Sequence, residues 1–296
     1  STYSPHQGPL FQPDLNQSEP LEMDKMYDTA LIFFGVFCIA FAFAPVGLGG
    51  GLLFVPLLHY GADLPIDGTL LAVSLSLTAV VSYGSGLAHR KKGHHDDEAI
   101  KSALVGAIPG ALLGVGIVVV LGDNLDTVFK TVSIVILAWA LVKTRRKITS
   151  TNSTDADEND ESRETQHKNL RLGAATGGTL SSVLAIGAGV IYVPVLQQYT
   201  GLSTRKSIGS SLHLMMVVVP IAVITHLAFI SSSERDALVE QIGVLFALPF
   251  LTFIGARLGA QFGMNYISSQ NIMKIFMTLT AVVLVRYLWD LSGLIV

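Results

Sequence analysis

The chain has 296 residues, of which half are hydrophobic and only 14% are charged, with a formal net charge of −3. A soluble domain carries about 25% charged residues, so most of this surface must face something other than water. The Lys and Arg residues are too dispersed for binding to nucleic acid, and a single cysteine, Cys38, excludes a disulfide within one chain. These features predict a protein embedded in the lipid bilayer, in agreement with the mean hydropathy of +0.55.

Residues 1–24 are polar and lack the basic-then-apolar order of a signal peptide, and we expect a disordered tail there. Eight apolar segments follow, and a spanning helix needs about 20 mostly apolar residues. Residues 143–169 are rich in Ser, Thr, Asp, Glu and Lys, and we expect them to link two halves. The apolar segments are 28–60, 66–89, 98–121, 125–142, 170–200, 205–231, 238–262 and 270–294.

The two halves carry similar motifs in the same order. A glycine-rich run at 49–56 aligns with one at 187–194, and further pairs follow at matching positions. Duplicated halves with interrupted apolar segments indicate a transporter and the position of its binding site. The further pairs are Ser74 with Ser211, His89 with His226, and the Gly-Ala-x-x-Gly step at 110–114 with that at 255–259. The predicted organisation is a tail at 1–24, a first transmembrane repeat at 25–145, a charged cytoplasmic linker at 146–168 and a second transmembrane repeat at 169–296.

The predicted fold class is an all-α polytopic membrane protein of two pseudo-symmetric repeats, each with a broken or hairpin first segment and three transmembrane helices. The first and fifth segments are over 30 residues long and are interrupted near the middle by small residues. If both turn back as hairpins, Arg205 and Lys206 stay inside with the basic residues at 90–92 and 143–147, and the repeats are inverted. If both segments cross the membrane, the repeats are parallel. We favour inversion.

The glycine-rich runs are the first candidate for a binding site. Freed backbone groups are tolerated at membrane depth only where they line a cavity or are buried in protein. Each break also creates a half-helix start with roughly half a positive charge and several free N–H donors, which suits an oxyanion. The alternative is that the glycines serve only close helix packing. The candidate residues are Gly49, Gly50, Gly51, Gly187, Ala188 and Gly189.

Polar side chains inside the apolar segments are the second candidate. The hydroxyls of Ser74 and Ser211 either donate to the anion or bond to the backbone of neighbouring helices. His89, His213 and His226 either have structural roles, or donate to the anion or relay a proton, because histidine changes charge near neutral pH.

Arg257 is the one strong cation well inside a segment, and its fork fits sulfonate oxygens. Alternatively it holds helix ends or extends to the cytoplasmic face. The histidines and carboxylates at 94–98 resemble a metal cluster in composition, but neighbouring ligands in a short turn seldom converge on one ion. Tyr83 stands where the pattern of intramembrane serine proteases needs glycine before Ser85. We expect no metal site, no cofactor and no enzymatic activity.

Three duplicated features are characteristic together: glycine runs at 47–51 and 187–189 followed by proline, Ser-Leu pairs at 74–75 and 211–212, and the two Gly-Ala-x-x-Gly steps. Their order over about residues 28–294 resembles the TauE/SafE family, the sulfite-exporter group of permeases. Ala188 departs from the duplicated pattern, since the first half has Gly50, so the two loops need not bind equally.

The resemblance implies a secondary transporter of small organosulfur anions, such as sulfite or sulfoacetate, that works by alternating access in the plasma or inner membrane. Its expected partners are the small anionic substrate, the lipid bilayer and a coupling ion, either a proton or sodium. Two alternatives remain at this point. One is an anion channel, and the other is a permease for another small carboxylate or inorganic anion.

Overall fold

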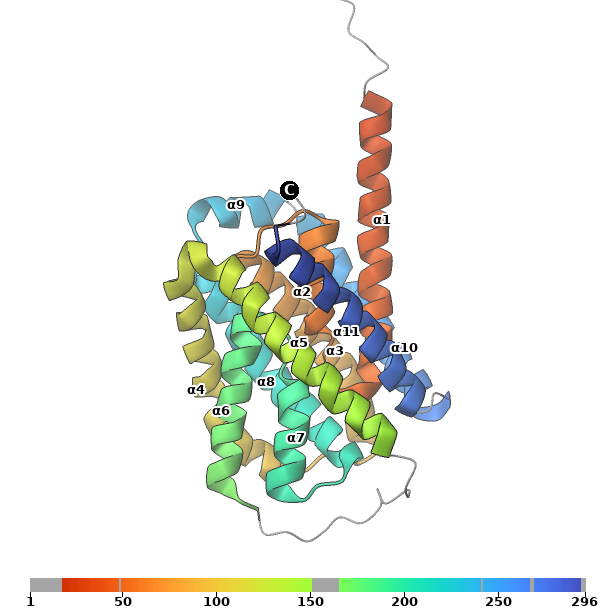
Figure 1. Cartoon of the computed structure of the whole chain (residues 1–296), viewed down its shortest axis with the longest axis vertical. Helices are drawn as coiled ribbons and strands as arrows, with labels where there is room; N and C mark the ends of the chain where they lie inside the picture. Colours follow the sequence, from red (N-terminus) through yellow and green to blue (C-terminus); the bar gives the residue numbers. More distant parts are fainter. Residues whose placement is uncertain (1–17, 48, 151–164, 241, 267–268, 294–296) are drawn as a thin grey trace, which may run out of the picture.

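The computed structural model describes residues 18–47, 49–150, 165–240, 242–266 and 269–293, and every regular element in them is a helix (Figure 1). The first half contains α1 (Ser18–Phe43), η1 (Ala44–Val46), α2 (Gly51–Gly61), α3 (Gly68–Lys91), α4 (Asp97–Leu121), η2 (Gly122–Asn124) and α5 (Leu125–Ser150). The second half contains α6 (His167–Leu184), α7 (Gly189–Thr200), α8 (Thr204–Phe229), α9 (Ser232–Glu240), α10 (Ile242–Tyr266) and α11 (Ser269–Leu291).

The helix starts follow from capping residues in the sequence. Asp67 precedes α3 and accepts the Leu70 N–H at 2.8 Å, and Asp96 precedes α4 and accepts the Ala99 N–H at 2.8 Å. An acidic side chain at this position satisfies a free backbone donor and complements the helix dipole. The polar connections between the apolar segments therefore set where the helices begin.

Two helices begin before the apolar segments that the sequence predicts. Helix α1 already begins at Ser18, so residues 18–24, expected in the tail, are helical. Helix α9 begins at Ser232, in the short polar connection between the apolar segments 205–231 and 238–262. The Glu234 carboxylate accepts the Ser231 N–H at 2.6 Å, and the Ser231 hydroxyl accepts the Glu234 N–H at 3.3 Å. This reciprocal pair is a capping box. Of the tail, residues 1–17 lie outside the described residues, as do residues 151–164 of the linker.

The first and fifth apolar segments each fold back on themselves. Gly35 of α1 lies against Leu57 of α2, and Ile32 of α1 lies near Gly61 of α2, so the two helices are antiparallel. Figure 1 shows α2 returning toward the end of the molecule at which α1 begins. Helices α6 and α7 are arranged in the same way, with Gly173 beside Tyr199 and Gly177 beside Tyr192.

Glycine stripes bring helices of different halves into backbone contact. Gly106, Gly110 and Gly114 of α4 face the backbone carbonyls of α6, and a methyl group on any of them would overlap a carbonyl oxygen. On α10, Gly255 and Gly259 face the carbonyls of α1 in the same way. Without a hydrophobic drive between helices in lipid, small residues that permit close approach stabilise such pairs. The two Gly-Ala-x-x-Gly steps are therefore packing surfaces between the halves.

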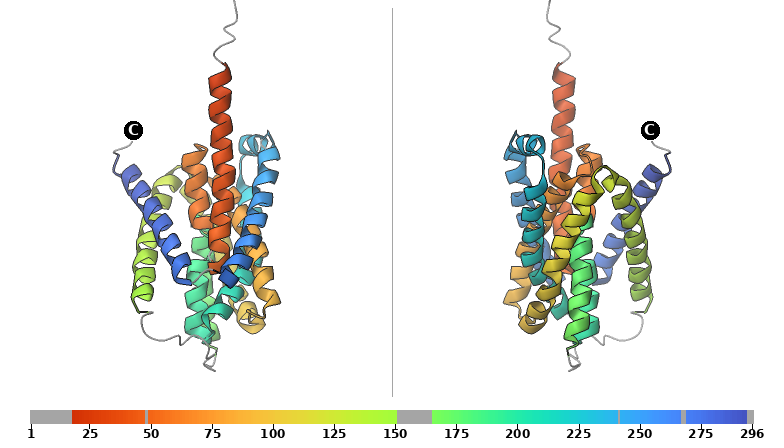
Figure 2. Two further views of the ribbon diagram at one scale, coloured as in Figure 1. Left: turned by 90° about the vertical axis from the view of Figure 1, so that its right-hand side faces the viewer. Right: turned by 90° about the vertical axis from the view of Figure 1, so that its left-hand side faces the viewer.

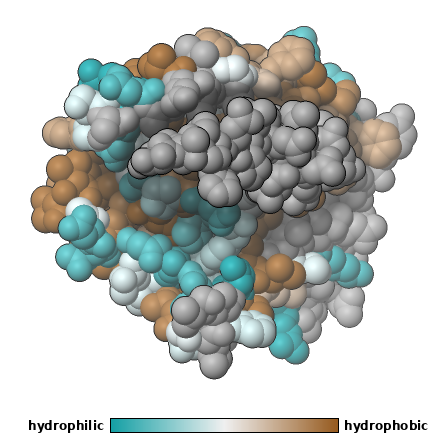
Figure 3. All heavy atoms as spheres, turned by 90° about the horizontal axis from the view of Figure 1, so that it is seen from above, coloured by the Kyte–Doolittle hydropathy of each residue, from teal (hydrophilic) through white to brown (hydrophobic). Residues whose placement is uncertain are grey.

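Helices α5 and α11 pack on each other along one side of the molecule (Figure 2), and α11 also contacts α1 and α2. Three helical stretches among the described residues are long and apolar enough to cross a membrane: Gly68–Lys91, Asp97–Trp139 and Thr204–Phe229. Large apolar side chains point outward, and Val120 of α4 is 87% exposed. Seen from above, hydrophilic side chains form a band from the left of the face toward its centre, and the margin carries both hydrophilic and hydrophobic side chains (Figure 3).

Candidate functional site

The first break lies between η1 and α2. Gly47, Gly49 and Gly50 have φ values of 72°, 76° and 77°, a region that residues with a Cβ rarely adopt. The chain therefore leaves the helical path here, and α2 begins at Gly51 without a side-chain cap. The start of α2 is buried, and the Leu53 N–H donates to the Gly50 carbonyl at 3.0 Å. The N–H groups of Gly51 and Leu52 before it are donors that the helix itself does not satisfy.

The second break separates α6 from α7, which begins at Gly189, also without a side-chain cap. Ala185 has a φ of 49° and Gly187 a φ of 57°, so this break contains a non-glycine residue in the left-handed region. Such a residue costs of order 1–3 kcal/mol and persists only where the surroundings fix it. Ala188, which precedes α7, has a φ of −63°, whereas Gly50 is left-handed. The departure from the repeat pattern thus coincides with a different backbone conformation.

The two breaks meet in the protein interior. A Cβ on Gly51 would overlap the carbonyl oxygen of Ala185 and would lie 2.8 Å from the carbonyl carbon of Ile186. The same position is 2.7 Å from the hydroxyl oxygen of Thr78 on α3. A Cβ on Gly49 would lie 3.5 Å from the Met215 side chain on α8. Helices α3 and α8 pack along each other, so both breaks lie against this pair.

Buried hydroxyl groups without partners lie on α3 and α8 beside the breaks. Ser74, Thr78 and Ser211 are fully buried, and none of their hydroxyls has a hydrogen-bond partner among the described residues. Ser74 is one helical turn from Thr78, and Ser211 is one turn from Met215. A buried hydroxyl without a partner costs about 1–3 kcal/mol, so these groups are suited to a bound ligand. Thr78 was not among the binding residues predicted from the sequence, although its position four residues after Ser74 places it on the same helix face.

His226 is the candidate histidine with a contact near a break. Its Nε2 donates to the carbonyl of Ser182 at 3.1 Å, three residues before Ala185. In the first half the corresponding helix α3 contacts the segment before the break by another group, since the hydroxyl of Ser85 donates to the carbonyl of Ala44 in η1 at 2.5 Å.

His89 and His213 lie together with the turn after α3. The ring of His89 is 6.0 Å from that of His94, and the ring of His213 stacks on that of His95 at 5.2 Å. The turn packs tightly on α8, because a side chain on Gly209 would overlap the His94 carbonyl oxygen. Residues 94–98 were predicted to lie in a short turn, and nothing in the sequence indicated this contact. Among the described residues, no three His, Cys, Asp or Glu side chains are arranged to hold a metal ion.

The charge state of the turn follows from its surroundings. Burial first, and then the positive charges of Arg205 and Lys92, lower the pKa of His94, so its imidazole is neutral at neutral pH. His89 lies 11 residues beyond Thr78, about 16 Å along α3, and one helical turn beyond Ser85.

Arg257 lies half-buried on α10, next to Ala256, whose side chain is near Gly84 of α3. The contacts of the described residues do not bring its guanidinium to either break. Its role as a substrate ligand therefore stays a prediction, as do those of the glycines, serines and histidines.

Long apolar helices, interrupted by breaks that meet beside buried polar groups, are typical of membrane transport proteins. A profile of the sulfite exporter TauE/SafE family matches residues 32–287. The chain belongs to this family, and it is therefore a membrane-embedded protein of a family of transporters. Comparison with curated proteins and with solved structures found no match in either case.

Proposed function

We propose that the protein is a secondary transporter of small organosulfur anions, either sulfite or sulfonates such as sulfoacetate. The observation that carries the proposal is the contact of one uncapped helix start, at Gly51, with the second break at Ala185 and Ile186, shortly before the other uncapped start at Gly189. The unpartnered hydroxyl of Thr78 lies at this contact, and those of Ser74 and Ser211 lie about one helical turn from residues that contact the first break. Helix starts of this kind favour an oxyanion through backbone donors and the helix dipole. The hydroxyls supply further donors, so the anion is held without an adjacent full charge.

The proposed mechanism is alternating access by two inverted repeats. Two features support this arrangement. Each half begins with an antiparallel helix pair, α1–α2 or α6–α7, and each half packs a glycine stripe on the other, α4 on α6 and α10 on α1. One part of each half then moves against the rest, and the site opens to one face at a time. The end at which α3 ends and α4 begins faces the cytoplasm in this proposal, because Arg90, Lys91 and Lys92 lie there.

Coupling to protons is proposed for the histidines and not for the anion site itself. His226 is bonded to the segment before the second break, and His89 and His213 pack on the turn at the opposite end of α3. Protonation of a buried imidazole changes the cost of its burial, so it biases one packing arrangement against another. Sodium remains the alternative coupling ion, and Arg257 the candidate cation for attracting the anion.

The first experiment measures uptake of labelled sulfite, sulfoacetate, sulfate and acetate into proteoliposomes, with and without a pH gradient. We expect saturable uptake that prefers sulfite or sulfoacetate and that the gradient accelerates. If none of the four anions is taken up, the proposed substrate class is wrong. If uptake does not depend on the pH gradient, proton coupling is excluded. An anion channel, the alternative, would instead give ohmic current without coupled accumulation.

The site is tested by single hydroxyl deletions. Ser74→Ala and Ser211→Ala should each raise the KM for the anion about tenfold, since a hydrogen bond to a charged group contributes roughly 1.5–3 kcal/mol. Ser76→Ala is the matched control, because the Ser76 hydroxyl already donates to the Ala72 carbonyl of its own helix at 2.8 Å. Equal kinetics for all three variants would contradict the placement of the site.

A further inference from the structure

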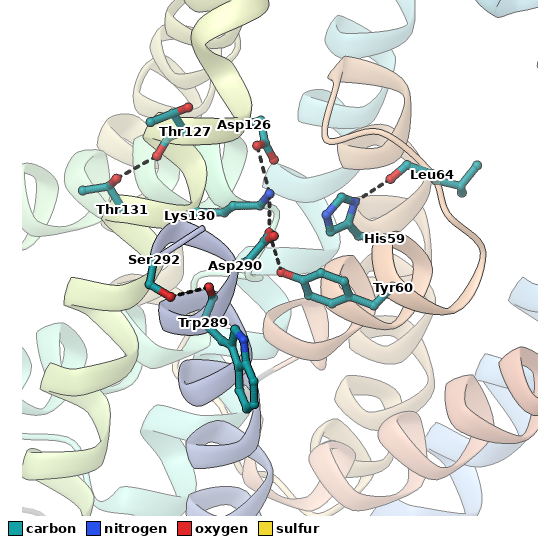
Figure 4. Close-up of polar contacts among 10 residues, drawn as sticks. All are labelled: His59, Tyr60, Leu64, Asp126, Thr127, Lys130, Thr131, Trp289, Asp290 and Ser292. Carbon is teal, nitrogen blue, oxygen red and sulfur yellow. Dashed lines mark hydrogen bonds and ion pairs between the residues drawn. The ribbon is translucent and has the colours of Figure 1, made fainter. Parts of the chain in front are cut away.

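A polar network joins the end of α2 to the α5–α11 pair (Figure 4). Lys130 of α5 contacts Asp126 at 2.9 Å and Asp290 of α11 at 2.5 Å. The hydroxyl of Tyr60, in the last turn of α2, donates to the same oxygen of Asp290 at 3.1 Å. The Arg286 guanidinium lies over the Tyr60 ring, 4.4 Å from its centre.

The cation at the centre of this network is buried, whereas the Asp126 and Asp290 side chains are 45% and 24% exposed. The Lys130 side chain is only 10% exposed, and a buried ammonium must be paired to be tolerated. Because Asp290 is held by Lys130, its carboxylate is fixed in place as an acceptor for Tyr60. A hydrogen bond to a charged acceptor is shorter and stronger than one between neutral groups. The Tyr60 hydroxyl therefore ties the end of α2 to a rigid ion pair between two other helices.

The corresponding half-helix α7 is held in a different way. The side chain of Gln197 donates to the hydroxyl of Thr204 at the start of α8 at 2.8 Å, and the Tyr199 carbonyl accepts the Gln166 N–H before α6 at 2.9 Å. These contacts connect α7 to its direct neighbours in its own half. The end of α2, by contrast, is tied by a tyrosine to a pair of helices contributed by both halves.

We infer that Tyr60 is a positioning residue, whose hydrogen bond to Asp290 holds α2 so that its start at Gly51 has the conformation that binds the anion. This inference rests on the proposed function. Tyr60 lies nine residues from Gly51, about 14 Å along the helix, so it acts through α2 and not by contact with the substrate. The left-handed glycines at 49 and 50 allow the start of α2 to shift when its other end is released.

The test is Tyr60→Phe, which removes one hydroxyl and keeps the ring beneath Arg286. We expect the KM for sulfite or sulfoacetate to rise about tenfold, with the maximal rate kept, because a hydrogen bond to a carboxylate is lost. The matched control is Tyr83→Phe. The Tyr83 hydroxyl also joins two helices, since it donates to the Met216 carbonyl at 2.9 Å, but it does not involve α2. Its KM should stay within about twofold of the wild type.

Two further measurements separate positioning from a merely structural tie. Asp290→Ala removes the acceptor and should raise the KM too. The double variant with Tyr60→Phe should have the same KM as Asp290→Ala, because that single change already removes the Tyr60 hydrogen bond. Hydrogen exchange should be faster in the α2 peptide of Tyr60→Phe and unchanged in the α7 peptide. The inference is overturned if the KM of Tyr60→Phe is unchanged or if hydrogen exchange in its α2 peptide is unchanged. It is also overturned if the increases in KM from the two single variants multiply in the double variant.

The exchange measurement also keeps the two proposals apart. If the wild-type protein transports none of the anions tested, the proposed function fails. In that case unchanged exchange in the α2 peptide overturns the tie between Tyr60 and α2, and faster exchange confirms the tie while removing its role in binding.

Discussion

Replacing Gly51 by alanine should disturb the candidate site more than any other single methyl group on α2. The new Cβ would overlap the carbonyl oxygen of Ala185 and lie 2.7 Å from the Thr78 hydroxyl oxygen. A backbone carbonyl cannot rotate away, so the two breaks must separate. Inserting a methyl group into a packed interior costs about 1–3 kcal/mol. If this cost falls on the anion-bound state, the KM should rise roughly 5- to 150-fold.

The control is Gly61→Ala at the other end of the same helix. A Cβ there would lie 3.7 Å from Ile32, an ordinary van der Waals contact. Uptake kinetics and thermal unfolding in detergent should be measured on both variants. We expect Gly51→Ala to raise the KM and Gly61→Ala to leave it unchanged. The same KM and the same Tm for the two variants would refute the close approach of the two breaks.

Three further predictions concern the framework of the protein. Gly110→Ala should lower the free energy of unfolding by about 2 kcal/mol, because the new Cβ would overlap the Ala175 carbonyl oxygen. Gly116→Ala is the control, since its Cβ would enter open space and should change the Tm little or not at all. Thermal unfolding of the two variants measures the difference. Ser231→Ala removes the capping box and should weaken α9 by about 1 kcal/mol, seen as faster hydrogen exchange in that helix alone. The pKa of His94 lies below its usual value, so as the pH falls below about 6.5 the unfolded state takes up a proton before the folded state does. The free energy of unfolding should therefore decrease as the pH falls. His94→Gln should weaken this pH dependence when unfolding is measured between about pH 5 and pH 8.

Much of the architecture could be predicted from local sequence patterns. Apolar segments of about 20 residues, separated by polar turns, predict helices with boundaries close to the observed ones, since each helix forms within its own segment. The breaks at Gly49 and Gly187 could be predicted because glycine runs are costly inside a helix. The start of α9 could also have been predicted, because a serine followed three residues later by a glutamate is typical of a helix start. Residues 231–234 were instead interpreted as a short polar connection.

The contacts that define the candidate site could not be predicted in the same way. The approach of Thr78 and Met215 to the breaks depends on how α3 and α8 pack, which one sequence does not reveal. Tyr60 and Asp290 are 230 positions apart, and neither stands in a recognisable motif. The two halves also differ at these positions, so the internal repeat gave no signal for the network around Lys130.

The glycine stripe of each half packs on a helix of the other half, and this bears on the stability of one half alone. Helix α4 completes its contacts on α6 and helix α10 on α1, so each half supplies a surface that only the other half covers. A single half alone would leave backbone carbonyls and a stripe of small residues facing lipid. A protein the length of one half would therefore need a second subunit to cover these surfaces, whereas in this chain the two halves cover each other.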